Sequence, residues 1–220
     1  MPSRIDVRCI RIVRTALLGV DIMDSAVAAT EVTQPIRMRD AYICRDGLIA
    51  LLTAILLRRT FAALAIGQHL VKAGKRWALD IPACDTKTRQ PLEFSISKDL
   101  SARIDMYIEQ YRRHIPGADT HQGLWPSHLG NPTCPPAIGE TIRNRTRKAF
   151  GFGVSPHRFR HAAASFWAIQ DPANVRGAKD LLGHASHDMT EKHYNMAQSR
   201  LASRALVHAI DRCVWGDRKC

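Results

Sequence analysis

Three short motifs lie in the C-terminal part of the chain: Ser155-Pro156-His157-Arg158-Phe159-Arg160-His161, Leu181-Leu182-Gly183-His184 and Thr190-Glu191-Lys192-His193-Tyr194. Breaking a phosphodiester bond without a metal ion requires a nucleophile, cations on the non-bridging oxygens and a proton donor for the leaving oxygen. A tyrosine can serve as the nucleophile, and the planar guanidinium of an arginine can bond two phosphate oxygens at once. No single motif is specific, but the ordered set indicates strand cleavage and rejoining on a nucleic acid.

The charge of the chain agrees with a nucleic-acid partner. Lys and Arg number 32 against 20 for Asp and Glu, which gives a formal net charge of +12. Such a charge favours an extended polyanion, and binding through phosphate contacts is salt-dependent because counterions are released. We therefore expect double-stranded DNA as the partner. Composition alone would also fit a basic protein with a solvated surface, or a ribosome-associated one.

Cysteine spacing and hydropathy exclude several other classes. The six cysteines are scattered without a C-x-x-C pair, which argues against a zinc ribbon and against a compact disulfide framework. The longest apolar run, residues 48–57, is shorter than the roughly 18 residues of a membrane span, and no export signal is visible. We expect reduced thiols, no membrane association, and a cytoplasmic, nucleoid-associated protein of prokaryotic or phage type.

A metal site is the weaker interpretation of the histidines. His157 and His161 stand four residues apart, but Arg158 and Phe159 occupy the positions after His157, so the glutamate of an H-E-x-x-H motif is absent. A second group consists of His184, His187 and His193, and its only nearby carboxylates are Asp188 and Glu191. We therefore expect neither a metal nor a cofactor.

The residue pattern predicts an α+β fold, a mainly helical domain with a small antiparallel sheet. Residues 77–82 and 92–96 read as strands joined by a turn at 85–91, and residues 116–136 read as a long loop, functional or mobile. Helices are expected from their apolar periodicity or caps at residues 41–57, 97–114, 138–150, from Ser155 onward, at 175–182 and at 201–213. Residues 1–39 show no clean periodicity, and we interpret them as a remnant linker or arm. The domain limits are then 1–39, 40–200 for the catalytic domain, and 201–220 for a C-terminal helix and tail.

Residues 40–200 resemble the catalytic domain of tyrosine recombinases, the phage-type integrases, through the three motifs above and a hairpin lysine in Thr86-Lys87-Thr88. The resemblance implies a tyrosine–3′-phosphate intermediate and rejoining without metal or ATP, in site-specific recombination or integration of a mobile element. Tyr194 would be the nucleophile and Arg160 a phosphate ligand. His157 and His184 would support proton transfer and phosphate binding, and Lys87 would be the general acid.

Two departures from the family pattern stand out. An ungapped alignment on Ala62-Ala63-Leu64 places Leu57 where the first catalytic arginine is expected, with Arg58 one step later. Arg58 can serve only if the helix end slips by one residue, and losing one such electrostatic contact typically costs about 100-fold to 1,000-fold in rate. The family also usually carries an N-terminal core-binding domain, which forty residues cannot encode. We therefore expect a truncated or degenerate integrase, or one that needs a partner.

Further contacts are expected from two helices. Arg143 and Arg147 share a helix face at i, i+4 spacing, and Lys148 follows. This cluster is predicted either to contact DNA phosphates or to be a solvated helix face. Because the C-terminal helix of this family often packs on a neighbouring protomer, residues 201–213 are expected to mediate a homo-oligomer on DNA.

Three rival functions remain open at this point. A DNA-binding remnant that has lost catalysis would explain Leu57 and the missing N-terminal domain, and it would form no covalent adduct with DNA. A type IB topoisomerase-like enzyme shares the chemistry but would relax supercoiled plasmid without a partner site. A metal-dependent nuclease, the weakest of the three, would cleave in a chelator-sensitive way.

Overall fold

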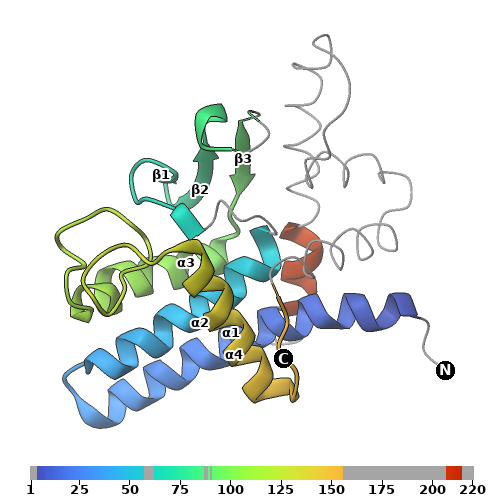
Figure 1. Cartoon of the computed structure of the whole chain (residues 1–220), viewed down its shortest axis with the longest axis horizontal. Coiled ribbons are helices and arrows are strands. Elements are labelled where there is room, and N and C mark those ends of the chain that lie inside the picture. Colours follow the sequence, from blue (N-terminus) through green and yellow to red (C-terminus); the bar gives the residue numbers. More distant parts are fainter. Residues whose placement is uncertain (1–3, 57–61, 87–88, 90, 156–206, 215–220) are drawn as a thin grey trace.

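The computed structural model describes residues 4–56, 62–86, 89, 91–155 and 207–214. Within these residues, a three-stranded antiparallel sheet in the order β1-β2-β3 lies beside a larger group of helices (Figure 1). The predicted α+β fold, mainly helical with a small antiparallel sheet, is confirmed.

Two long helices form the base of the helical group. α1 spans Arg4–Thr33 and α2 spans Met38–Leu56, and the two run side by side (Figure 1). A stripe along α1 is fully buried in the core: Ile12, Ala16, Val20, Met23 and Ala26. The linker or arm predicted for residues 1–39 is therefore wrong for most of that segment. Its helical period was hard to recognise because small residues, alanine and Gly19, occupy much of the buried face.

The sheet follows the predicted turn and strand pattern, with one strand more than expected. β2 spans Arg76–Ile81 and β3 spans Leu92–Ser95, close to the predicted 77–82 and 92–96. β1, Leu70–Ala73, pairs antiparallel with β2, and only Leu70 of its four residues is buried. A strand with a single buried residue shows no alternation of polarity, so the pattern could not reveal it.

The predicted helix at 97–114 is present but changes its geometry along its length. α3 is Lys98–Met106, η3 is a π-helical stretch at Tyr107–Tyr111, and η4 is a 3₁₀ turn at Arg112–His114. The hydroxyl of Ser97 accepts a hydrogen bond from the Leu100 amide at 3.3 Å and caps the start of α3.

The long loop after this helix is anchored to the core. Leu124 and Trp125 are buried, and the Tyr107 hydroxyl donates to the Leu124 carbonyl at 3.1 Å. Arg112 Nη2 donates to the His121 and Gly123 carbonyls, each at 2.8 Å. Burial of Arg112 lowers its pKa from the ordinary value. The loop is thus part of the packed structure and leads into α4, Pro135–Phe150.

The C-terminal helix at residues 207–214 belongs to the same core. Four of its residues are buried: Val207, Ala209, Ile210 and Val214. In this chain, the described part of the predicted oligomer contact at 201–213 thus packs its apolar side against its own fold. Among the described residues, no helix is long and apolar enough to cross a membrane.

Burial controls the reactivity of one cysteine. Cys44 on α2 is fully buried, and burial raises its pKa to about 12 because the thiolate is poorly solvated there. We expect iodoacetamide at pH 8 to label exposed Cys84, Cys134 and Cys213 of the native protein, and Cys44 about a thousandfold more slowly. Time-resolved peptide mass spectrometry measures the rates, and labelling of Cys44 at the rate of Cys84 would contradict this burial.

Candidate functional site

The six residues predicted to carry the chemistry lie outside the described residues. They are Arg58, Lys87, His157, Arg160, His184 and Tyr194. Their roles therefore stay predictions, and the site is approached from the residues that precede and follow them.

Buried residues lie close to the ends of these segments. Ala54 and Ala62 flank the segment with Arg58, Thr86 and Leu92 flank Lys87, and Val154 precedes the first motif. All except the polar Thr86 belong to one core cluster. The Val154 amide also donates to Thr146 Oγ1 on α4 at 2.8 Å. The three segments that carry the predicted residues are thus attached to a common, packed base.

The predicted DNA-contacting cations lie toward the C-terminal end of α4. Arg147 and Lys148 are exposed, whereas Arg143 is half-buried. Arg143 Nη1 lies 3.1 Å from Glu140 Oε2, so its charge is partly balanced. Arg147 Nη1 donates to the neutral Asn144 Oδ1 at 3.0 Å, and no ion pair is found for Lys148 among the described residues. Arg147 and Lys148 therefore present the positive charge of this face, although cations near a helix C-terminus also interact favourably with the helix dipole.

A buried carboxylate that the sequence did not reveal orients α4. Asp46 on α2 accepts from Arg145 Nε at 3.0 Å and Nη2 at 2.7 Å through one oxygen, and from Arg45 Nη2 at 2.8 Å through the other. Arg45 Nη1 in turn donates to the Pro126 carbonyl at 2.7 Å. Asp46 and Arg145 are 99 residues apart, so no local pattern could have indicated the pair. The network joins α2, α4 and the long loop, and thereby positions the basic face of α4.

Removing this carboxylate should destabilise the fold. In Asp46→Ala, two arginines would lose their common partner while staying largely buried, with side chains 12% and 27% exposed. We expect a loss of about 2–3 kcal/mol, below the 3–5 kcal/mol typical of fully buried pairs because some water reaches the site. Urea unfolding followed by circular dichroism measures the change.

The matched control for this change is Glu140→Ala, which removes a carboxylate from an exposed ion pair whose side chains are 44% and 51% exposed. The control should shift the unfolding free energy by about 0.5 kcal/mol or less. Equal effects of the two substitutions would show that Asp46 contributes no more than a surface charge.

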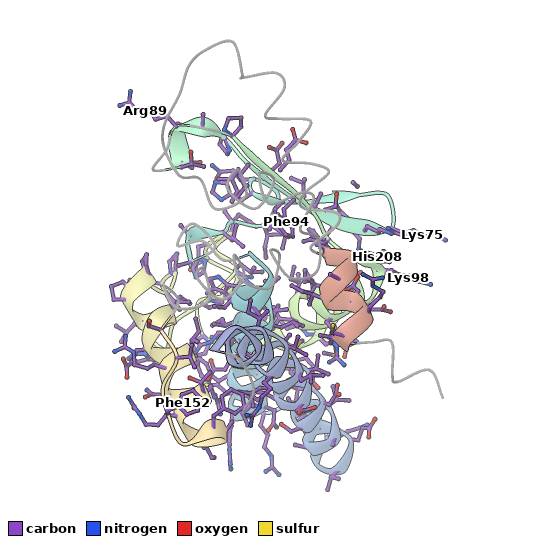
Figure 2. All side chains as sticks on the ribbon, turned by 90° about the vertical axis from the view of Figure 1, so that its right-hand side faces the viewer. Lys75, Arg89, Phe94, Lys98, Phe152 and His208 are labelled. Atoms are coloured by element: carbon purple, nitrogen blue, oxygen red, sulfur yellow. The ribbon has the colours of Figure 1, made fainter. Side chains whose placement is uncertain are left out.

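A second unanticipated contact holds the chain just before Lys87. His69, buried in the turn just before β1, has its Nε2 2.9 Å from Asp85 Oδ2. Its other ring nitrogen, Nδ1, accepts a hydrogen bond from the Ala65 amide at 3.1 Å. Asp85 ends the 3₁₀ turn η2, Ala83–Asp85, which follows β2. Figure 2 shows Arg89 of this connection away from the helices, while Phe94 on β3 is buried in the core.

No metal centre is found among the described residues, which contain no group of three or more His, Cys, Asp or Glu side chains placed to hold an ion. Three described features lie near the segments that carry the predicted residues. They are the cations on α4, the buried Asp46 network and the His69–Asp85 contact.

Comparison with known proteins identifies the family of the chain. The phage integrase family model matches residues 21–200. Tyrosine recombinase XerD of Chlamydia pneumoniae is 28% identical over 124 residues, which cover 56% of this chain and 40% of the relative. Tyrosine recombinase XerD of Pseudomonas aeruginosa is 25% identical over 180 residues, which cover 81% of this chain and 57% of the relative.

This chain therefore spans only about half the length of these curated relatives. No solved structure matches it significantly. The family match begins inside α1 and continues through the last of the three sequence motifs. The chain belongs to the phage integrase family.

Proposed function

We propose that this chain cleaves and rejoins DNA strands in site-specific recombination, through a 3′-phosphotyrosine intermediate. The Tyr194 hydroxyl oxygen attacks the phosphorus and loses its proton toward His157 or His184. The bond from phosphorus to the 5′ oxygen breaks, and Lys87 donates a proton to that oxygen. Arg160 and Arg58 hold the non-bridging oxygens. Attack by another 5′ hydroxyl reverses these steps and releases the tyrosine, so neither metal nor ATP is consumed.

One observation carries the proposal, namely the family match over residues 21–200, a span that contains the positions of all six proposed residues. The names of the matched relatives, both tyrosine recombinases, support the same reaction class. The base to which the catalytic segments attach is well packed, as a site that aligns several groups on one phosphate requires.

Double-stranded DNA is the proposed partner, because the net charge of +12 and the cations on α4 both favour a polyanion. We further propose that the chain acts as a homo-oligomer on DNA and works in the cytoplasm, associated with the nucleoid.

The test is trapping of a covalent adduct. Nicked suicide DNA fragments from the flanks of the chain's own genetic element release a short strand after cleavage, so the reverse reaction is lost. The protein is incubated with them in chelator and resolved on a denaturing gel. We expect a band of protein joined to DNA that survives denaturant and disappears after protease treatment.

The other outcomes separate the rival functions. Salt-sensitive DNA binding without any adduct would overturn the proposal and indicate a catalytically inactive remnant, for which Leu57 offers a physical reason. Relaxation of supercoiled plasmid without sequence preference would indicate a type IB topoisomerase-like enzyme. Cleavage that requires a divalent metal and is lost in chelator would indicate a nuclease.

The α4 cations lead to a prediction about DNA binding itself. Replacing Arg147 and Lys148 with alanine should lower the slope of log Kd against log salt by about 2. Binding releases about 0.9 counterion for each phosphate contact, and the double variant makes two contacts fewer. Fluorescence anisotropy with labelled duplex between 50 and about 200 mM salt measures the slope.

The control variant replaces Arg37 and Arg39, which lie exposed at the turn into α2, and removes the same net charge from another place on the fold. It should leave the slope nearly unchanged. If both double variants lower the slope equally, the net charge of the chain, rather than the α4 face, governs binding.

A further inference from the structure

The geometry of His69 determines which of its nitrogens carries the proton. Its Nδ1 accepts from the Ala65 amide at 3.1 Å, and an imidazole nitrogen that accepts a hydrogen bond carries no proton. The ring proton of the neutral histidine is therefore on Nε2, which donates to Asp85 Oδ2 at 2.9 Å. Both ring nitrogens therefore form hydrogen bonds, and only one orientation of the ring allows the bonds to Ala65 and to Asp85 together.

The two partners of His69 come from different parts of the chain. Ala65 follows the segment that contains Arg58, and it forms a bridge with Gly123 of the long loop. Asp85 ends the turn after β2, and Lys87 is the second residue beyond it. One buried side chain therefore connects the backbone after Arg58 to the backbone before Lys87.

Backbone hydrogen bonds hold the described residues on either side of Lys87. The Asp85 amide donates to the Pro82 carbonyl at 3.0 Å, and the amide of buried Thr86 donates to the Ala83 carbonyl at 3.3 Å. The Arg89 amide closes the next turn on the Thr86 carbonyl at 3.1 Å, with Arg89 at a φ of 50°. Two peptide units separate Asp85 from Lys87, so their Cα atoms lie within about 7.6 Å of each other.

We propose that His69 and Asp85 form a positioning pair for Lys87, the general acid of the proposed reaction. The inference rests on the proposed function for its chemistry, but its structural part stands on His69, Asp85 and Thr86. His69 is fixed by the Ala65 amide and holds the Asp85 carboxylate. The carboxylate restrains the turn, and the restrained turn limits where the amine two residues later can reach.

The pair acts through position and not through its charge. The Asp85 side chain is 41% exposed, so water screens its charge. Asp85→Asn keeps an oxygen that can accept from His69 Nε2, whereas Asp85→Ala keeps none. A positioning role therefore predicts that asparagine preserves most of the function and that alanine does not.

The kinetic test uses two DNA substrates that differ in the leaving atom. In one substrate, sulfur replaces the bridging 5′ oxygen at the scissile phosphate. A departing thiolate needs no proton at neutral pH because a thiol has a pKa near 8.5, so its departure does not depend on the general acid. Adduct formation is timed on both substrates for the wild type, Asp85→Ala, Asp85→Asn and the double variant His69→Ala/Asp85→Ala.

We expect Asp85→Ala to slow adduct formation about 10-fold to 100-fold on the oxygen substrate and less than about 3-fold on the sulfur substrate. Asp85→Asn should stay within about 3-fold of wild type on both substrates, and the double variant should be no slower than Asp85→Ala. The control is Asp105→Ala, which removes a carboxylate bonded to Lys72 and Trp77 at the β1–β2 hairpin. It should affect both substrates alike.

Two kinetic results would overturn the inference. Equal slowing of Asp85→Ala on both substrates would indicate a structural role only. Slowing of Asp85→Asn as large as that of Asp85→Ala would indicate that charge, not position, matters.

Amide hydrogen exchange tests the structural part independently of activity. Asp85→Ala should accelerate exchange of the Thr86 and Arg89 amides about 10-fold and leave those of β3 within about 2-fold of wild type. If the wild type forms no adduct on either substrate, the proposed function fails, and the exchange data alone decide whether the pair holds the turn. Unchanged exchange at Thr86 and Arg89 would overturn the inference.

Discussion

Replacing Tyr194 with phenylalanine is expected to abolish the covalent protein–DNA adduct. Phenylalanine keeps the ring but lacks the oxygen that would bond to phosphorus, and without a nucleophile the other catalytic groups have nothing to assist. Removal of the nucleophile from such a site costs about 1,000-fold or more in rate. The adduct should therefore fall below detection on the denaturing gel, while duplex binding at a given salt concentration stays near that of the wild type.

The matched control for this substitution is Tyr42→Phe. Tyr42 lies on α2, where the Arg45 guanidinium stacks on its ring at 4.8 Å from the centroid, and a phenylalanine ring can keep that contact. The control should form the adduct at the rate of the wild type. An adduct that persists in Tyr194→Phe would assign the nucleophile to another residue and remove the central element of the proposed mechanism.

Replacing Gly47 with valine is expected to destabilise the fold by about 3 kcal/mol. A Cβ at Gly47 would lie 2.7 Å from Met23 Cγ and 2.8 Å from the Gly19 carbonyl oxygen, both on α1. Helix propensity alone favours valine over glycine by a few tenths of a kcal/mol. Overpacking typically costs about 1–3 kcal/mol, and here part of the obstacle is backbone that cannot rotate away. The cost of overpacking therefore exceeds the gain in helix propensity, and the substitution lowers the free energy of unfolding.

A thermal scan with circular dichroism measures this effect. A loss of about 3 kcal/mol should lower Tm by roughly 6–12 °C in a chain of this size. The control Ala28→Val places the same branched side chain at an exposed position of α1, where only the helix propensity changes, by about 0.6 kcal/mol. If Gly47→Val unfolds at the temperature of the control, α1 and α2 do not depend on this close approach.

The elements that the sequence predicted are those with a local signal. Strand β3 alternates Leu92 and Phe94 inward with polar neighbours, and the apolar stripe of the predicted helix at 97–114 places Leu100, Ile104 and Tyr107 in the core. Repeats of two and of about 3.6 residues are properties of the backbone itself, so they are visible within a few residues. The apolar stripe continues from α3 into the π-helical η3, where Tyr107 is buried in the same core as Leu100 and Ile104.

The helix α1 shows where local patterns fail. Its buried face mixes large apolar residues, among them Ile12 and Met23, with small ones, and Gly19 closely approaches Gly47 of α2 at the helix crossing. A close helix crossing selects small residues for their volume rather than for their hydrophobicity, so the face carries little periodic signal. Only the position of α2 explains why these residues are small.

By itself, the sequence determined the α+β class, the β2–β3 hairpin and, through three ordered motifs, the recombinase resemblance that the family match confirms. Only the tertiary structure decided that α1 is part of the core, that Asp46 joins Arg45 to Arg145, and that His69 holds Asp85. The physical reason is the range of the interactions. Backbone periodicity and motif spacing act within a short stretch of chain, whereas close packing and buried ion pairs join residues that only the folded chain brings together.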